Sequence, residues 1–176
     1  MASRYSPSFA KNILSRSLRA IVDPHPQKSQ IREVFEFFSG CCVYCGKSIT
    51  LGSKEMHLDH LVSESHGGSN HISNRVPSCA TCNEEEKREL DWGEFLSSKP
   101  AAKETLAMRR QRIEEWVRLF PANVARLPAD LNREVHDEIE KVVVAFDIAM
   151  GNLRDSRDRR SRSSSRGVSN VENEPN

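Results

Sequence analysis

The sequence lacks several features that define other classes of protein. Its longest apolar runs, such as Val142–Phe146, fall far short of the roughly 20 residues that span a bilayer, and the N-terminus has no apolar signal core. The formal net charge of the 176 residues is only +1, so the chain does not carry the strong positive field of a dedicated nucleic-acid binder. Any basic surface must be local. We therefore expect a soluble, cytoplasmic protein with no membrane partner.

Cysteine is scarce, but its placement is informative. Four of the five cysteines form two Cys-x-x-Cys pairs, Cys42 with Cys45 and Cys79 with Cys82. Paired spacing and an odd total fit a reducing compartment and metal ligation better than a disulfide framework. Four thiolates at this spacing suit a closed tetrahedral site, so we predict a structural Zn2+ ion. Cys41 is expected to be an ordinary thiol.

The length allows one globular unit with a modest core, which at this size buries about 70% of the surface that unfolding exposes. Hydrophobic periodicity and turn residues predict an α+β fold. An amphipathic helix over 6–21 has a basic side, which is either a solvated face or a phosphate contact. The remaining elements expected up to residue 98 are a helix at 29–38, short strands at 55–58 and 75–77 around a loop with Gly67 and Gly68, and a helix from Thr81.

The second half of the chain is predicted to be helical. One helix should run from Pro100 to Phe120, and another should follow Pro128 and end near Gly151. Their apolar stripes favour an antiparallel pair that packs on itself or on the N-terminal helices, and a homodimer or partner interface is the alternative. From residue 154 the composition changes to Arg, Ser and Asp without apolar periodicity, which predicts a disordered basic tail over 154–176. That tail is either simply solvated or weakly attracted to phosphate.

Asp59 and His60 lie between the two cysteine pairs and could carry chemistry. A carboxylate is a hard ligand suited to Mg2+ or Mn2+, and a neutral histidine can take a proton from water. Adjacent strand residues point to opposite faces, so the two side chains meet in one site only if the strand ends or bends there. The glycine-rich loop downstream permits such a bend. The pair therefore favours a metal-assisted hydrolase.

Six elements between residues 42 and 88 resemble, in order, an HNH endonuclease of the ββα-metal class. They are Cys42-x-x-Cys45, Asp59-His60, Gly67-Gly68, Asn74, Cys79-x-x-Cys82-Asn83 and Lys87. The resemblance implies that His60 is the general base and that Asn74 orients its ring. It also implies that Asp59 and Asn83 hold one catalytic Mg2+ or Mn2+ ion. Asn83 stands where many members carry the third-letter histidine, so this would be the H-N-N variant.

Two departures from the family pattern affect the expected DNA contacts. Ser63 stands where many relatives have proline, a change that we expect to be tolerated. Glu84–Glu86 follow Asn83, where basic residues often bind phosphate in the family. We therefore expect other parts of the protein, or a partner, to bind the DNA. The candidates are the N-terminal basic face, a partner protein, or Lys47, Lys54, Arg75, Lys87 and Arg88.

The sequence therefore predicts a metal-dependent HNH endonuclease that hydrolyses DNA phosphodiester bonds, as a nicking or double-strand-cleaving enzyme. Restriction or phage defence is a possible setting. Two alternatives stay open: a noncatalytic zinc module that binds nucleic acid or protein, and an RNase that uses the same site. DNA, a homodimer or a targeting protein are the expected partners. The predicted parts are N-terminal helices at 1–40, a nuclease core at 41–98, a C-terminal helical region at 99–153 and the tail at 154–176.

Overall fold

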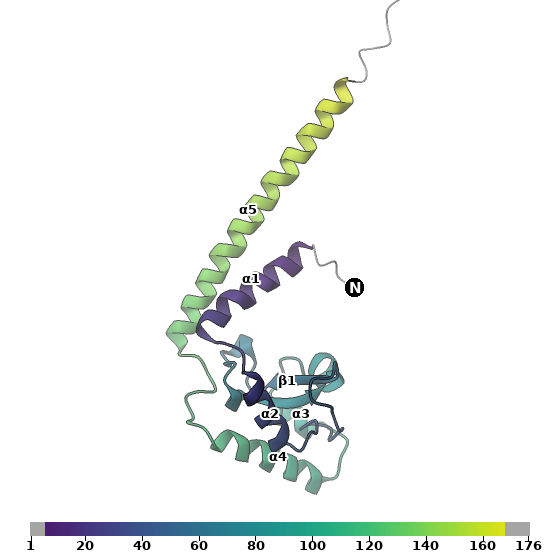
Figure 1. The fold of residues 1–176 in the computed structure, drawn as a ribbon, viewed down its shortest axis with the longest axis vertical. Coiled ribbons are helices and arrows are strands. Elements are labelled where there is room, and N and C mark those ends of the chain that lie inside the picture. The colour runs from purple at the N-terminus through teal and green to yellow at the C-terminus, as the bar shows by residue number, and fades with distance from the viewer. Residues whose placement is uncertain (1–5, 168–176) are drawn as a thin grey trace, which may run out of the picture. The chain divides into compact units, whose positions relative to one another are not determined.

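The computed structural model describes residues 6–167, with side chains for residues 6–162. The chain forms two compact units: one is Arg19–Glu134, and the other combines Met1–Leu18 with Val135–Asn176. Helices and a small two-stranded sheet make up the structure, which confirms the predicted α+β class (Figure 1). In the described part of the chain, no helix combines the length and apolar character that crossing a bilayer requires.

The sheet is an antiparallel hairpin of β1 (Met56–His60) and β2 (Arg75–Cys79), in which His60 lies directly opposite Arg75. Both strands occur where the sequence predicted them and extend two residues further at their C-terminal ends. The connecting loop contains two short 3-10 turns, η1 (Glu64–His66) and η2 (Ile72–Asn74). This register puts the end of β1 beside the start of β2, where polar residues of the connecting loop contact the hairpin.

Helices α2 (Lys28–Phe37) and α4 (Lys103–Arg118) supply the aromatic part of the core. The Trp116 ring is buried and lies 4.9 Å from Phe37 and 5.9 Å from Phe38, measured between ring centroids. Its Nε1 donates a hydrogen bond to the Ile72 carbonyl oxygen at 3.1 Å. Because a buried indole N–H needs a partner, this bond joins α4 to the hairpin loop as well as to α2. One predicted alternative was that helices of the second half of the chain pack on the N-terminal helices. Helix α4 does so, through its contact with α2.

Two further elements follow β2. A seven-residue π-helical segment, η3 (Thr81–Lys87), stands where a helix was predicted, and α3 (Trp92–Ser97) comes next. Asp91 caps α3, since its carboxylate accepts from the Gly93 and Glu94 amides at 2.8 and 3.1 Å. The cap directs Phe95 into the core, where its ring lies 5.0 Å from that of Tyr44.

The second unit contains most of α1 (Pro7–Val22) and most of α5 (Ala129–Gly167), which appears in light green and yellow in Figure 1. The predicted stop at Gly151 is wrong, and so is the prediction of disorder for residues 154–167, because α5 runs through both. Residues 168–176 of the predicted tail lie outside the described residues. Extending an existing helix does not require a new nucleus, so a segment of arginines, which are good helix formers, can continue it without an apolar face.

Candidate functional site

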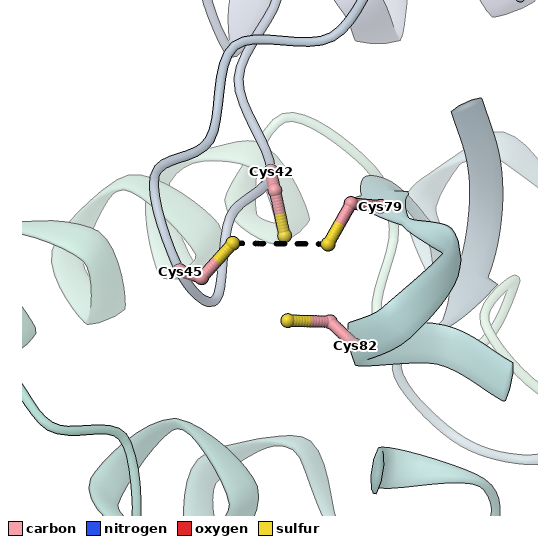
Figure 2. A group of neighbouring side chains, drawn as sticks. All are labelled: Cys42, Cys45, Cys79 and Cys82. Carbon is pink, nitrogen blue, oxygen red and sulfur yellow. Dashed lines mark hydrogen bonds between the residues drawn. The ribbon is translucent and has the colours of Figure 1, made fainter. Parts of the chain in front are cut away.

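The four paired cysteines come together at one point, as predicted. Cys42 and Cys45 lie in the turn after α2, Cys79 ends β2, and Cys82 lies on η3. All four sulfur atoms lie within 4.8 Å of one another and point towards a common centre (Figure 2). The Cys45 and Cys79 sulfurs are 3.8 Å apart, which is the edge of a tetrahedron with metal–sulfur bonds of about 2.3 Å. The cluster therefore fits a metal ion, consistent with zinc.

The burial of the thiols means that their thiolate forms need a positive charge nearby. Burial raises the pKa of Cys42 to about 11 and raises the pKa of Cys82 further. For Cys45 the effect of burial is outweighed by hydrogen bonds, above all from the Lys47 backbone amide, and its pKa is lowered. Buried thiolates need positive charge nearby, and the Lys99 ammonium supplies some of it through a hydrogen bond to Cys82. A divalent cation would supply the rest.

The first cysteine turn is fixed from outside by α4. Arg109 donates to the carbonyl oxygens of Tyr44 and Cys45 at 2.8 and 3.1 Å. Gly46, next in the chain, has a φ of +76°, and any Cβ there would collide with the Arg109 guanidinium. The positive φ favours glycine at this position, and a larger residue would also displace the Arg109 guanidinium from its place.

Asp59 points into the protein, where it is 4% exposed. Its Oδ2 accepts from the Tyr44 hydroxyl at 2.6 Å and pairs with Lys87 Nζ at 3.1 Å. Burial raises the pKa of Asp59, although Lys87 and Tyr44 oppose that shift. Lys87 also donates to the His60 carbonyl oxygen at 2.9 Å, and its side chain is completely buried. Lys87 thus cannot reach a DNA phosphate in this arrangement, contrary to the prediction.

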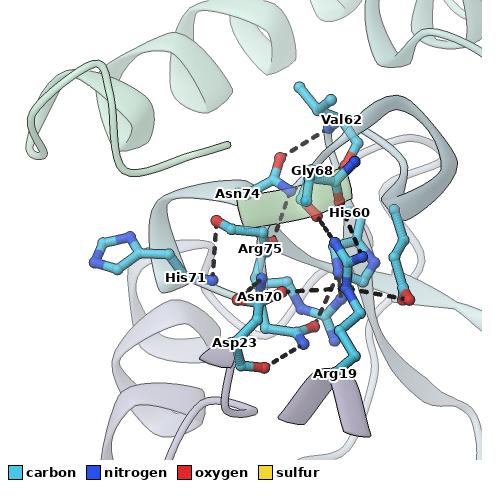
Figure 3. Close-up of polar contacts among 12 residues, drawn as sticks. Arg19, Asp23, His60, Val62, Gly68, Asn70, His71, Asn74 and Arg75 are labelled. Atoms are coloured by element: carbon cyan, nitrogen blue, oxygen red, sulfur yellow. Dashed lines mark hydrogen bonds and ion pairs between the residues drawn. The ribbon is translucent and has the colours of Figure 1, made fainter. Parts of the chain in front are cut away.

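His60 lies on the opposite face of β1, as strand alternation requires. Its Nε2 is 3.1 Å from the Asn70 side-chain oxygen, and Arg75 Nη1 lies 2.5 Å from both ring nitrogens. The Asn74 side chain does not orient this ring, as had been predicted. It bonds instead to both backbone groups of Val62 and to the Ser69 carbonyl oxygen, at 2.8 to 2.9 Å (Figure 3). Asn74 holds the loop after β1, and Asn70 holds the ring.

The partners of Asn70 determine which nitrogen of His60 carries the proton. Asn70 Nδ2 lies 2.9 Å from the Asp23 carbonyl oxygen, and the Asn70 backbone amide donates to the Asp23 carboxylate at 2.8 Å. A carbonyl oxygen only accepts, so the amide nitrogen of Asn70 must face Asp23 and its oxygen must face His60. The contact with Asn70 therefore assigns the proton of the neutral ring to Nε2, although Arg75 Nη1 lies equally close to both ring nitrogens. The lone pair is on Nδ1, next to Arg75.

The surroundings keep His60 neutral. Burial lowers its pKa to about 3, and the positive charge of Arg75 lowers it in the same direction. The positive charge of Arg19 also lowers the pKa of His60, to a smaller extent. Arg19 is held by a hydrogen bond to the Gly68 carbonyl oxygen at 2.9 Å and an ion pair with Glu64 at 3.2 Å. A neutral imidazole meets the first requirement for a general base, but its Nδ1 lone pair faces Arg75 Nη1 and can accept a proton from water only when Arg75 moves away.

The remaining predicted residues are less closely connected to His60. Asn83 lies on η3 and is partly exposed. Its backbone carbonyl oxygen accepts a hydrogen bond from the backbone amide of Arg88 at 3.2 Å. A group of at least three Cys, His, Asp or Glu side chains that lie close together could hold a metal ion. Among the described residues, only the four cysteines form such a group. Asp59 is already neutralised by Lys87. The Mg2+ or Mn2+ site on Asp59 and Asn83 therefore stays a prediction.

Three residues in these networks were not predicted from the sequence: Tyr44, Asn70 and Asp23. Tyr44 lies inside the first cysteine pair, and a hydroxyl between two metal ligands is a signal that could have been used. Asn70 follows the two glycines within the loop that joins His60 to Asn74. Asp23 belongs to the Asp-Pro-His-Pro turn between α1 and α2, and nothing in the sequence indicates its contact with Asn70.

Comparison with known proteins agrees with this arrangement. Residues 42–94 match the model of the HNH endonuclease family. The chain is also similar to the "SPbeta prophage-derived putative HNH endonuclease YoqL" of Bacillus subtilis (strain 168), with 30% identity over 94 residues. That similarity covers 48% of this chain and 38% of the relative, so the chain spans well under half of the length of YoqL. The predicted resemblance to HNH endonucleases is confirmed for residues 42–94.

Proposed function

We propose that this protein is an endonuclease that hydrolyses DNA phosphodiester bonds, with Nδ1 of His60 as the general base. The observation that carries the proposal is the hydrogen-bonded series from Asp23 through Asn70 to His60 Nε2, within a domain that matches the HNH family. The series fixes the tautomer and the direction of the ring. A base whose lone pair has one fixed direction can activate a water molecule on one side of a bound phosphate.

Arg75 is the residue that we assign to the scissile phosphate. It is the cross-strand neighbour of His60, and its buried Nε has no hydrogen-bond partner among the described residues. A phosphate is a better partner for a guanidinium than a neutral imidazole is, because it offers charged oxygens. Binding would draw Arg75 away from Nδ1 and offset its charge. Both effects raise the basicity of His60 when substrate is present.

The cysteine cluster has a structural role in this proposal. Zinc held by four thiolates has no open position for substrate, so it would stabilise the junction of β2 and η3 rather than take part in hydrolysis. A catalytic Mg2+ or Mn2+ would neutralise charge on the phosphate, and we assign no step to it because Lys87 already pairs with Asp59. The buried Lys87–Asp59 pair is also the observation that favours the alternative, a noncatalytic zinc module.

A plasmid-cleavage assay tests the proposal. Wild-type protein should nick supercoiled plasmid, and His60→Ala should reduce the rate by about 10² to 10⁴, the usual contribution of a general base. His66→Ala is the matched control, since His66 is an exposed histidine on the same loop that bonds to Ser63. Equal rates for wild type and His60→Ala would refute the assignment, and folded, zinc-loaded protein without any cleavage would favour the noncatalytic module.

The same assay identifies the substrate and the ion. Plasmid, single-stranded DNA and structured RNA are offered side by side with Mg2+, with Mn2+ or with EDTA. Preference for RNA would replace the DNA assignment with the RNase alternative. A role in restriction or phage defence is supported only by the family, and the similar Bacillus protein is by its name prophage-derived.

A further inference from the structure

The outer face of α5 carries apolar side chains that nothing in their own unit covers. Val144 and Ile148 are 50% and 60% exposed and lie one turn apart, and Gly151 continues the same row. A different stripe of α5, which includes Val142 and Phe146, is half-buried. An ion pair between Lys11 and Asp147 at 2.6 Å joins α1 to α5, and Asp147 lies at the boundary between these two stripes. The helix therefore has two apolar faces, and its own unit accounts for one.

Gly151 is the second observation. A glycine inside a helix costs about 1 kcal/mol relative to alanine, and here it interrupts neither the helix nor its direction. A Cβ at this position would meet no atom within 4 Å in the protein. The chain itself therefore gives no packing reason for glycine at 151. Close approach of another backbone is the usual reason for such a residue.

The charges along α5 are the third observation. Residues 135–147 contain four carboxylates and one lysine, a net charge of −3, whereas residues 148–162 contain five arginines and two aspartates, a net charge of +3. Two such helices side by side in parallel would place like charges together over their whole length. An antiparallel pair would place each acidic segment against a basic one.

We propose that the outer face of α5 binds the same face of a second copy of this chain, antiparallel, with the two-fold axis between Ala149 and Met150. This register places Ile148 of each copy against Gly151 of the other, where the missing side chain lets the helices approach. It also places Asp137 opposite Arg162 and Glu140 opposite Arg159. One axis thus accounts for Ile148, the glycine and both charged segments, whereas Val144 lies opposite Asp155 of the other copy.

Such a dimer is held by a small apolar centre and by exposed ion pairs. Exposed ion pairs are weak individually and are screened by salt, so association should depend on ionic strength. The dimer does not depend on the nuclease proposal, because none of its residues belongs to the hairpin site. With two nuclease domains in one particle, it would let a one-strand-cutting enzyme act on both strands.

Light scattering after size-exclusion chromatography of the full chain tests the proposal. In 50 mM salt the mass should be twice the 19.9 kDa of one chain, and it should fall towards one chain as salt rises to 1 M. Ile148→Glu should raise the dissociation constant by at least about tenfold. Leu153→Glu is the matched control, since Leu153 is 68% exposed on the same helix but faces about 140° away from Ile148. A monomeric wild type, or equal effects of both variants, would overturn the proposal.

Charge exchange tests the orientation. One variant carries Arg159→Glu and Arg162→Glu, and the other carries Asp137→Arg and Glu140→Arg. Each should be monomeric alone, because like charges then face each other at both ends of the pair. A mixture of the two should restore dimers. Dimers formed by either variant alone would refute the antiparallel register, and circular dichroism verifies that both variants keep their helices.

Discussion

Asp59 and His60 are neighbours in one strand, yet the two faces of the β1–β2 hairpin have different physical characters. On the inner face, Asp59 is buried with Tyr44 and Lys87 beside the cysteine cluster. On the outer face, His60 lies among Asn70, Arg75 and the loop. The inner face is closed and neutralised by its own residues, whereas the outer face keeps the unpartnered Nε of Arg75 beside a neutral imidazole. We propose that the inner face stabilises the domain and that the outer face carries the chemistry.

Removing the metal should have the largest effect, and it tests the role of the inner face. Cys79→Ser or Cys82→Ser is expected to unfold the hairpin, because structural zinc contributes on the order of 10 kcal/mol to the stability of small domains. Cys41→Ser is the control, since Cys41 lies outside the cluster. Metal content and thermal unfolding are measured together. A Cys82→Ser protein with an unchanged melting temperature would contradict a structural role.

The next effect concerns the buried ion pair. Lys87→Met leaves the Asp59 carboxylate buried without its cation, which should lower the free energy of unfolding by about 3 to 5 kcal/mol. Adding Asp59→Asn to that variant should restore much of the loss, because the uncompensated charge is then gone. Lys54→Met, on the surface, should change little. Urea unfolding gives all four values, and if Lys87→Met alone were neutral, the inner face would not need its pair.

A comparison of two asparagines separates support of the loop from orientation of the ring. Asn74→Ala removes three hydrogen bonds to backbone groups and should cost about 1 to 3 kcal/mol of stability. Asn70→Ala frees the His60 ring and should slow cleavage by about tenfold or more, with a changed pH–rate profile. Asn70→Asp keeps the acceptor, and its charge should move the acid limb of that profile to higher pH. Identical pH profiles for wild type and both Asn70 variants would exclude a role in positioning the ring.

The smallest effect is a difference in pH dependence between the two faces. The pKa of His60 falls from 6.5 unfolded to about 3 folded, so between these values the unfolded chain binds an extra proton. His60 should therefore reduce the free energy of unfolding as pH falls from 6.5 towards 3, by at most about 1.4 kcal/mol per pH unit, and have no such effect above 6.5. Asp59, with its raised pKa, acts with the opposite sign.

Urea titrations between pH 5 and 7.5 measure this dependence. His60→Gln should flatten the acid side of the stability curve relative to wild type. His66→Gln is the control histidine and should leave the curve unchanged. A wild-type curve that coincides with that of His60→Gln would mean that the ring is solvated rather than buried beside Arg75.

Local patterns were enough to predict several parts of this molecule. The spacing of two Cys-x-x-Cys pairs predicted the cluster, because ligands on tight turns are brought together by local geometry. Alternation and turn residues predicted both strands. Strand alternation left open whether Asp59 and His60 meet in one site, and the bend that would bring them together was expected from the glycine-rich loop. The end of the helix at Gly151 was predicted wrongly, since helix propagation depends on the preceding turns more than on a single residue.

The amino-acid sequence by itself determined the α+β class, the cysteine cluster, the resemblance to HNH endonucleases and the importance of His60 as a candidate base. Only the tertiary structure decided which side chains touch it. Asn70 rather than Asn74 orients the ring, and Lys87 is buried against Asp59 instead of facing solvent. The physical reason is the separation along the sequence between contacting residues. Sequence spacing determines contacts within a turn or between paired strands. Bonds such as that from Asn70 to Asp23 join residues 47 positions apart and exist only once the core has formed.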